Sequence, residues 1–150
     1  MWQLVEASGI GTAPTNTQDN AYCQLWNAYT DRTIWLRELG YSNILGGAGR
    51  IALKRTTARG TNTTTVAGTF RDSTATSSAT LDLTWSVEAT KTGRYLRREQ
   101  YASPIGPLLQ WTYWQGEGLA IPQSTGLAMV VPTNAAGIAG EHWAVWEEEA

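Results

Sequence analysis

The side chains that usually perform acid–base, nucleophilic and metal chemistry are scarce in this sequence. One histidine, His142, and one cysteine, Cys23, occur among 150 residues. These two residue types carry most such chemistry near neutral pH. A single cysteine forms no internal disulfide, and one histidine supplies too few ligands for a transition-metal site. The sequence therefore predicts no cofactor and no metal site, with Cys23 as a small buried hydrophobe.

The carboxylates provide the best case for an enzyme. Paired Asp or Glu side chains held a few ångströms apart cleave glycosidic bonds, and Glu99, Glu117 and Glu141 are candidates for such a pair. Their spacing does not mark a pair, and no nucleophile-elbow pattern supports a triad of His142 with Ser103 and Glu117. We therefore predict that the chain is not an enzyme and has no catalytic residues, and we interpret His142 as a surface or interface histidine.

Tryptophan, in contrast, is abundant, with eight in the chain. Its large apolar area and single N–H donor suit both cores and interfaces. In an extended strand Trp111 points to one face and Trp114 to the other, and Trp143 and Trp146 repeat this arrangement near the C-terminus. One face must enter the core, while the other is free to meet a neighbouring subunit, a capsid surface or a sugar. The alternative is that a sandwich of this size simply fills its core with tryptophan.

Strand patterns dominate the rest of the chain. Leu81, Leu83, Trp85, Val87 and Ala89 alternate with polar residues, which is the period-two signature of a half-buried strand. Similar runs occupy residues 33–39, 50–56, 64–71, 94–101, 108–114, 118–121, 127–131 and 141–147. Turn signals rich in Gly, Pro and Asn separate them. The pattern predicts one all-β domain over residues 1–150, an antiparallel β-sandwich.

Three segments are harder to interpret. Residues 22–29 have helical spacing, but residues 25–27 with a polar turn at 30–32 and the alternating run 33–39 also fit a hairpin, which we favour. Residues 7–20 are small and polar, so we expect an extended N-terminal arm or loop within residues 1–20, after a short strand at residues 2–6. Residues 72–80 have low complexity and are expected to form a loop.

The net charge is −2, but the charged side chains are distributed unevenly along the chain. Residues 50–98 hold nine basic and three acidic side chains, whereas residues 99–150 hold six acidic side chains and no Lys or Arg. Either strands from the two segments lie side by side and neutralise each other, or complementary patches meet between copies and guide assembly. The basic residues are not clustered with aromatics, so no nucleic-acid partner is expected.

No stretch approaches the roughly 18 apolar residues of a membrane span, and no secretory signal is visible. We therefore expect no membrane partner, and synthesis in a cytoplasm.

Several sequence blocks are informative together. They are Gln24-Leu25-Trp26-Asn27, Thr33-Ile34-Trp35-Leu36-Arg37-Glu38-Leu39, Trp111-Thr112-Tyr113-Trp114, Gly116-Glu117-Gly118-Leu119-Ala120-Ile121, Asn134, and Trp143-Ala144-Val145-Trp146-Glu147-Glu148. This layout resembles small jelly-roll-like head decoration or cement proteins of tailed bacteriophages. The resemblance implies a homotrimeric sandwich that sits on the outer capsid and clamps neighbouring major capsid subunits, with the N-terminal arm reaching a neighbour. It transfers no catalytic residues.

The sequence thus leads to one expected function and one alternative. We expect an antiparallel sandwich of jelly-roll type that decorates the outer capsid surface of a virion after synthesis in the host cytoplasm. Its partners would be the major capsid protein and further copies of itself. The candidate interface residues are Trp26, Trp111, Trp114, His142 and Trp146. The alternative is a carbohydrate- or receptor-binding module of a phage fibre or tail, in which exposed tryptophans stack on glycan rings.

Overall fold

The fold is known from a computed structural model that describes residues 1–12, 17–44, 49–101, 108–114, 118–132 and 139–149. All regular structure in these ranges is β, and none of it is helical. The strands are β1 (Trp2–Gly11), β2 (Ala21–Asn27), β3 (Ile34–Asn43), β4 (Gly49–Ala58), β5 (Thr61–Phe70), β6 (Thr76–Val87), β7 (Thr90–Tyr101), β8 (Leu108–Thr112), β9 (Leu119–Ile121), β10 (Thr125–Val130) and β11 (Gly140–Glu149).

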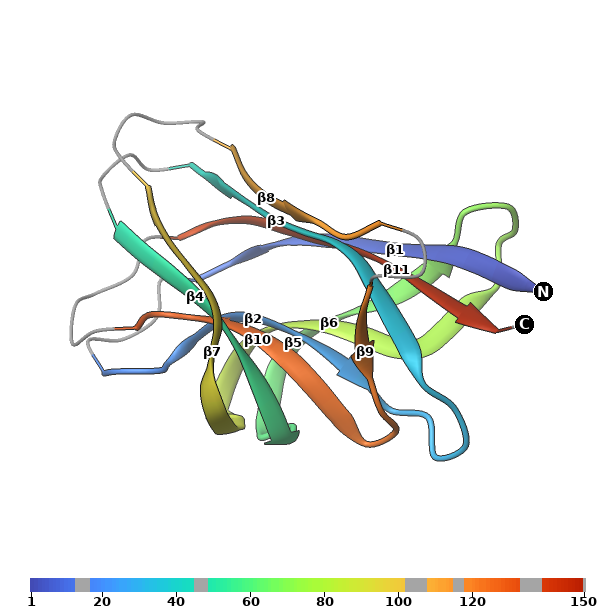
Figure 1. Cartoon of the computed structure of the whole chain (residues 1–150), viewed down its shortest axis with the longest axis horizontal. Helices are drawn as coiled ribbons and strands as arrows, with labels where there is room; N and C mark the ends of the chain where they lie inside the picture. Colours follow the sequence, from blue (N-terminus) through green and yellow to red (C-terminus); the bar gives the residue numbers. More distant parts are fainter. Residues whose placement is uncertain (13–16, 45–48, 102–107, 115–117, 133–138, 150) are drawn as a thin grey trace.

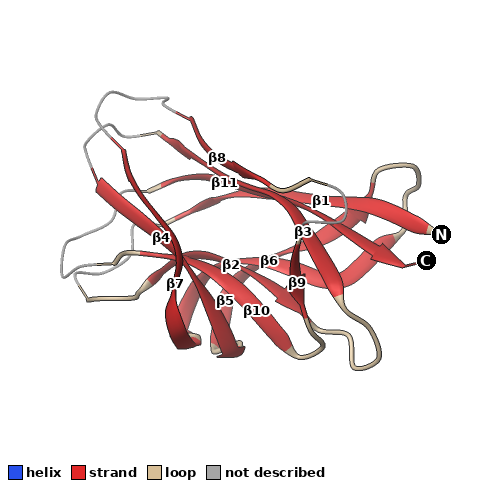
Figure 2. Cartoon of the chain, viewed as in Figure 1, coloured by secondary structure: helices blue, strands red, loops and turns tan. Residues whose placement is uncertain are grey.

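The strands form one antiparallel sheet that curls into a half-barrel (Figures 1 and 2). Their order is β7-β4-β10-β2-β6-β5-β1-β11-β3-β8, and β9 pairs with β3 beside β8. Figure 1 shows β1, β11, β3 and β8 as one layer, with β2, β10, β4 and β7 on the opposite side. The all-β, antiparallel prediction is therefore confirmed.

The core fills the space between the two layers. Side chains of β1, β6 and β11 alternate between this core and the outer surface, as a period of two requires. Trp111 and Trp146 are the largest fully buried side chains. Trp146 packs onto β5, where a Cβ atom at Gly68 would lie 2.3 Å from its ring. This contact joins β11 to β5 across the bend of the sheet.

Two arginines connect the free margins of the curl. One margin is β7 with its neighbour β4, and the other consists of β8 and β9. The Arg55 guanidinium donates a hydrogen bond to the carbonyl of Ala120 over 2.9 Å. The Arg97 guanidinium lies 5.6 Å from the centre of the Trp111 ring, a cation–π distance. Side chains thus bridge the two margins without main-chain pairing.

The expected hairpin over residues 25–39 is wrong, although both of its strands exist. β2 pairs with β6 and β10, whereas β3 pairs with β11, β8 and β9. Every residue of β2 is buried, so this strand needs neighbours on both sides and lies in the middle of its layer. The Asn27 amide donates to the carbonyls of Arg32 and Ile121 over 3.0 and 2.9 Å, which ties the connecting segment to β9.

The expected arm and the expected 72–80 loop are correct only in part: residues 12, 17–20 and 72–75 lie outside the strands, and residues 13–16 lie outside the described ranges. Residues 2–11 form β1, which lies between β5 and β11, with Val5 and Ala7 facing the core. β6 begins at Thr76, and Ser77 and Ala79 are buried. In both places the side chains facing the core are small, so the alternation they follow carries little hydrophobic contrast in the sequence.

We predict that Gly68→Ala destabilises the fold. The added methyl would meet the Trp146 ring and Val5, and overpacking of this kind lowers the free energy of unfolding by about 1–3 kcal/mol. Urea denaturation measures the change. Ala67→Ser, at the exposed neighbouring position, should stay within about 0.5 kcal/mol of the wild type. Equal stability of the two variants would contradict the packing role of Gly68.

Candidate functional site

The residues expected at an interface fall into two groups. Trp26, Trp111, Trp146 and His142 are buried within the protomer, whereas Trp114 is 77% exposed. The four buried side chains are therefore out of reach of a second molecule in this folded chain. Trp114 is the member of the set that the structure places on the surface.

Trp114 stands on a restrained backbone. It follows β8, and the Arg37 guanidinium of β3 donates a hydrogen bond to its carbonyl. The same guanidinium forms an ion pair with Glu147 of β11. The amide of the preceding residue, Tyr113, donates to the carbonyl of Arg37 over 2.7 Å. The indole is thus presented to solvent from a fixed position, which suits an interface residue because little backbone entropy is lost on binding.

The buried tryptophans fill the core. Trp146 Nε1 donates to Oε1 of Glu148 over 3.2 Å, inside the protomer. Trp111 lies under Arg97, and its Nε1 has no hydrogen-bond partner among the described residues. Packing between layers therefore explains these two indoles, as the alternative interpretation of the tryptophan content proposed.

His142 is inside the core, not on the surface as the sequence suggested. Its ring lies 5.1 Å from the Tyr41 ring and 6.0 Å from the Tyr22 ring, and the side chain is 0% exposed. Neither ring nitrogen has a hydrogen-bond partner among the described residues. Burial lowers the pKa of His142 to about 3. His142 and Trp143 lie on opposite faces of β11, and the face that carries His142 is the inner one.

The two oppositely charged segments do not neutralise each other as adjacent strands. Basic β4 pairs with basic β7, whereas acidic β11 pairs with β1 and β3. In the described part of the chain, the single ion pair between the two segments is Arg97–Glu99, at 3.6 Å along one strand. Arg50, Arg94 and Arg98 are exposed on β4 and β7. The protomer therefore carries a basic margin and, in the other layer, two exposed carboxylates on β11, Glu141 and Glu149, because Glu147 is paired with Arg37 and Glu148 is buried.

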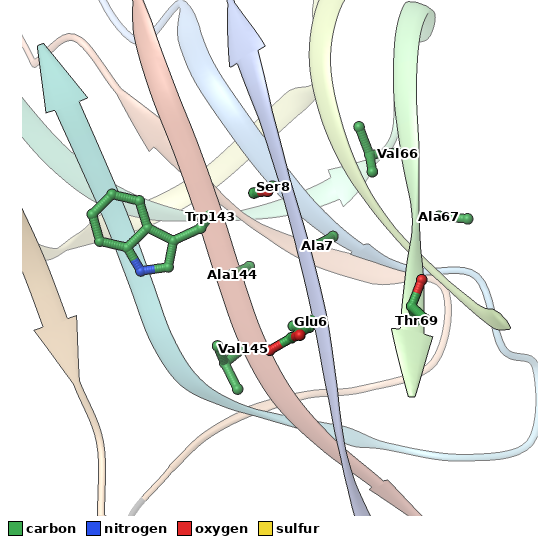
Figure 3. A pocket seen from close by; sticks show the side chains of 9 residues that line it. All are labelled: Glu6, Ala7, Ser8, Val66, Ala67, Thr69, Trp143, Ala144 and Val145. Atoms are coloured by element: carbon green, nitrogen blue, oxygen red, sulfur yellow. The ribbon is translucent and has the colours of Figure 1, made fainter. Parts of the chain in front are cut away.

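A second surface feature lies on the outside of β1, β11 and β3. The indole of Trp143 lies across Gly40, where a Cβ atom would be 2.0 Å from the ring. Its Nε1 donates to a carboxylate oxygen of Glu38. Beside it a groove of about 440 Å³ opens between β1 and β5, lined by Glu6, Ala7, Ser8, Val66, Ala67, Thr69, Trp143, Ala144 and Val145 (Figure 3).

The sequence pattern places Trp143 in a two-faced pair with Trp146 and does not predict this outer surface around Trp143. A glycine inside a strand often marks close approach of another group, so Gly40 was the available signal.

No protein-family model matches the chain, and no curated protein or solved structure matches it. Within the described ranges, no three His, Cys, Asp or Glu side chains gather so as to hold a metal ion. The same ranges contain no helix with the length and apolar character needed to traverse a membrane.

The buried, neutral His142 predicts a specific pH dependence of stability. Its folded-state pKa of about 3 lies below the ordinary value of 6.5, so between these values the unfolded chain binds the extra proton. The free energy of unfolding should fall as pH drops through this window, by about 2 kcal/mol between pH 7.5 and pH 5.

Urea denaturation at the two pH values measures this loss. His142→Phe keeps an aromatic ring but does not titrate, so it should remove most of the dependence above pH 5. An unchanged dependence in this variant would contradict the assignment to His142.

Proposed function

We propose that this chain is a virion structural protein that decorates the outer surface of a phage capsid and binds the major capsid protein through non-covalent contacts. Trp114 is the observation that carries the proposal. An indole that is 77% exposed on a restrained backbone has the properties of an interface hot spot. Exposed Trp2 and Ile10 on β1 add apolar surface elsewhere on the molecule.

The separation of charge supports assembly with further copies of the chain. A twofold dimer needs one patch that complements itself, whereas a ring joins two different patches on each protomer. The exposed arginines of β4 and β7 form one such patch, and the exposed Glu141 and Glu149 of β11, in the other layer, form the second. We therefore favour a closed homotrimer in which the basic margin of one copy faces the β11 carboxylates of the next.

Multivalency makes such an arrangement effective. A trimer that contacts several capsid sites gains avidity, because each later contact forms at high effective concentration. Under this proposal, the curled single sheet is a variant of the jelly-roll sandwich expected of phage head decoration proteins. Under this proposal the protein is made in the host cytoplasm and works on the outside of the virion.

We predict a trimer that is sensitive to salt. Light scattering should give three times the 16.4 kDa chain mass at low ionic strength, with dissociation as salt screens the charged patches. Arg94→Glu reverses an exposed charge on β7 and should weaken the trimer, whereas Arg94→Lys keeps the charge and should not. A chain that is monomeric at every salt and protein concentration would contradict the proposed assembly.

We predict that Trp114→Ala weakens capsid binding by about 30-fold or more, the effect of removing a hot-spot residue. Co-sedimentation with purified capsids that lack the protein measures the affinity. Thr112→Ala, at the exposed end of β8, is the matched control and should bind like the wild type. Equal affinity of both variants would exclude Trp114 as the contact, and absence of the wild-type protein from virions would overturn the proposal.

A further inference from the structure

The outer face of β1, β11 and β3 carries a rigid aromatic platform. Figure 3 shows the Trp143 indole broadside to the viewer and lying across β3, with Ser8 and Glu6 on the neighbouring strand. Gly40 beneath it leaves room for the ring, and the hydrogen bond from Nε1 to Glu38 restrains its rotation. The side chain is only partly buried, so a flat apolar surface parallel to the sheet remains accessible.

Exposed polar side chains lie around the Trp143 platform, on β1 and on β8. Ser8 is directly opposite Trp143 on β1, and Gln110 of β8 is directly opposite Gly40. The next row across the sheet contains Glu6. All three side chains are exposed. Ser8 and Gln110 are three strands apart, which at the usual spacing of neighbouring strands is about 14 Å. The hydroxyl, the amide and the carboxylate can therefore contact successive rings of one oligosaccharide.

The platform continues into a groove because β1 and β5 separate. Their ladder consists of Val5↔Phe70 and Glu6↔Thr69, while β1 runs on to Gly11. Beyond Glu6 the edge of β1 that faces β5 is no longer covered by this ladder. Small side chains line the opening and leave about 440 Å³, which is within the range of ligand sites.

We propose that this face binds a pyranose ring of a neutral polysaccharide, stacked on Trp143. One side of a pyranose presents C–H groups, which suit the face of an indole, while the hydroxyls of the stacked ring and of the neighbouring rings suit Ser8, Gln110 and Glu6. Nucleotides and acidic glycans are disfavoured, since the carboxylates of Glu38 and Glu141 on this side of the sheet repel phosphate and carboxylate groups, whereas Glu6 is paired with Arg71 over 3.1 Å. The site is distinct from Trp114 and does not depend on the proposed capsid role.

Binding to a glycan array tests the proposal. The array carries neutral gluco-, galacto- and manno-oligosaccharides beside sialylated and sulfated ones, and titration of tryptophan fluorescence follows the best neutral oligosaccharide. We expect neutral binding that falls at least about tenfold in Trp143→Ala and is largely kept in Trp143→Tyr, which can still stack. Ser8→Ala, a small change at an exposed position, should weaken binding several-fold without altering the melting temperature.

Trp114→Ala separates this site from the proposed function, because it should bind the oligosaccharide like the wild type. Conversely, Trp143→Ala should still bind capsids. The proposal is overturned if wild-type protein binds no neutral glycan, if it binds only acidic glycans, or if folded Trp143→Ala and Ser8→Ala variants both bind as the wild type does.

Discussion

The packing of β11 against the bend of the sheet is the contact on which the rest of the structure depends. Trp146 projects from β11 onto Gly68 of β5, and its ring also meets Val5 of β1. A single sheet has no second sheet to cover its apolar face, so it must bury that face by curling onto itself. The Trp146–Gly68 contact fixes how sharply it does so. Once the curl is set, the margins come close enough for Arg55 and Arg97 to bridge them.

Two buried polar side chains are accommodated in opposite ways. Asp82 of β6 is fully buried yet paired, since Arg59 donates to both of its carboxylate oxygens over 2.7 and 2.8 Å. Thr65 and Thr80 also donate to this carboxylate. A charge in this position is tolerated because its hydrogen bonds are satisfied. His142 represents the opposite solution, since an imidazole without partners stays neutral when it is buried.

The outward surfaces follow from the same geometry. Because β3 contributes Arg37 and Gly40 to the outside, it supports both Trp114 and Trp143, yet in different ways. Trp114 is presented away from the sheet by a restrained backbone, which suits contact with another protein. Trp143 lies along the sheet, which suits a flat ligand. Trp26, Trp111 and Trp146 are therefore buried in the protomer, whereas Trp114 and Trp143 form two distinct kinds of surface.

The sequence by itself determined the β class and most of the strands, because alternation is a local property that neighbouring residues report directly. The runs at 81–87 and 141–147 lie within β6 and β11. It did not determine which side of β11 faces inward, that β2 and β3 lie apart, or that residues 7–11 belong to a strand. Only the tertiary structure decided these, together with the burial of His142 and the seating of Trp143 on Gly40. Alternation reports that two faces differ, whereas the choice of inner face and of strand partner depends on residues far away in the chain.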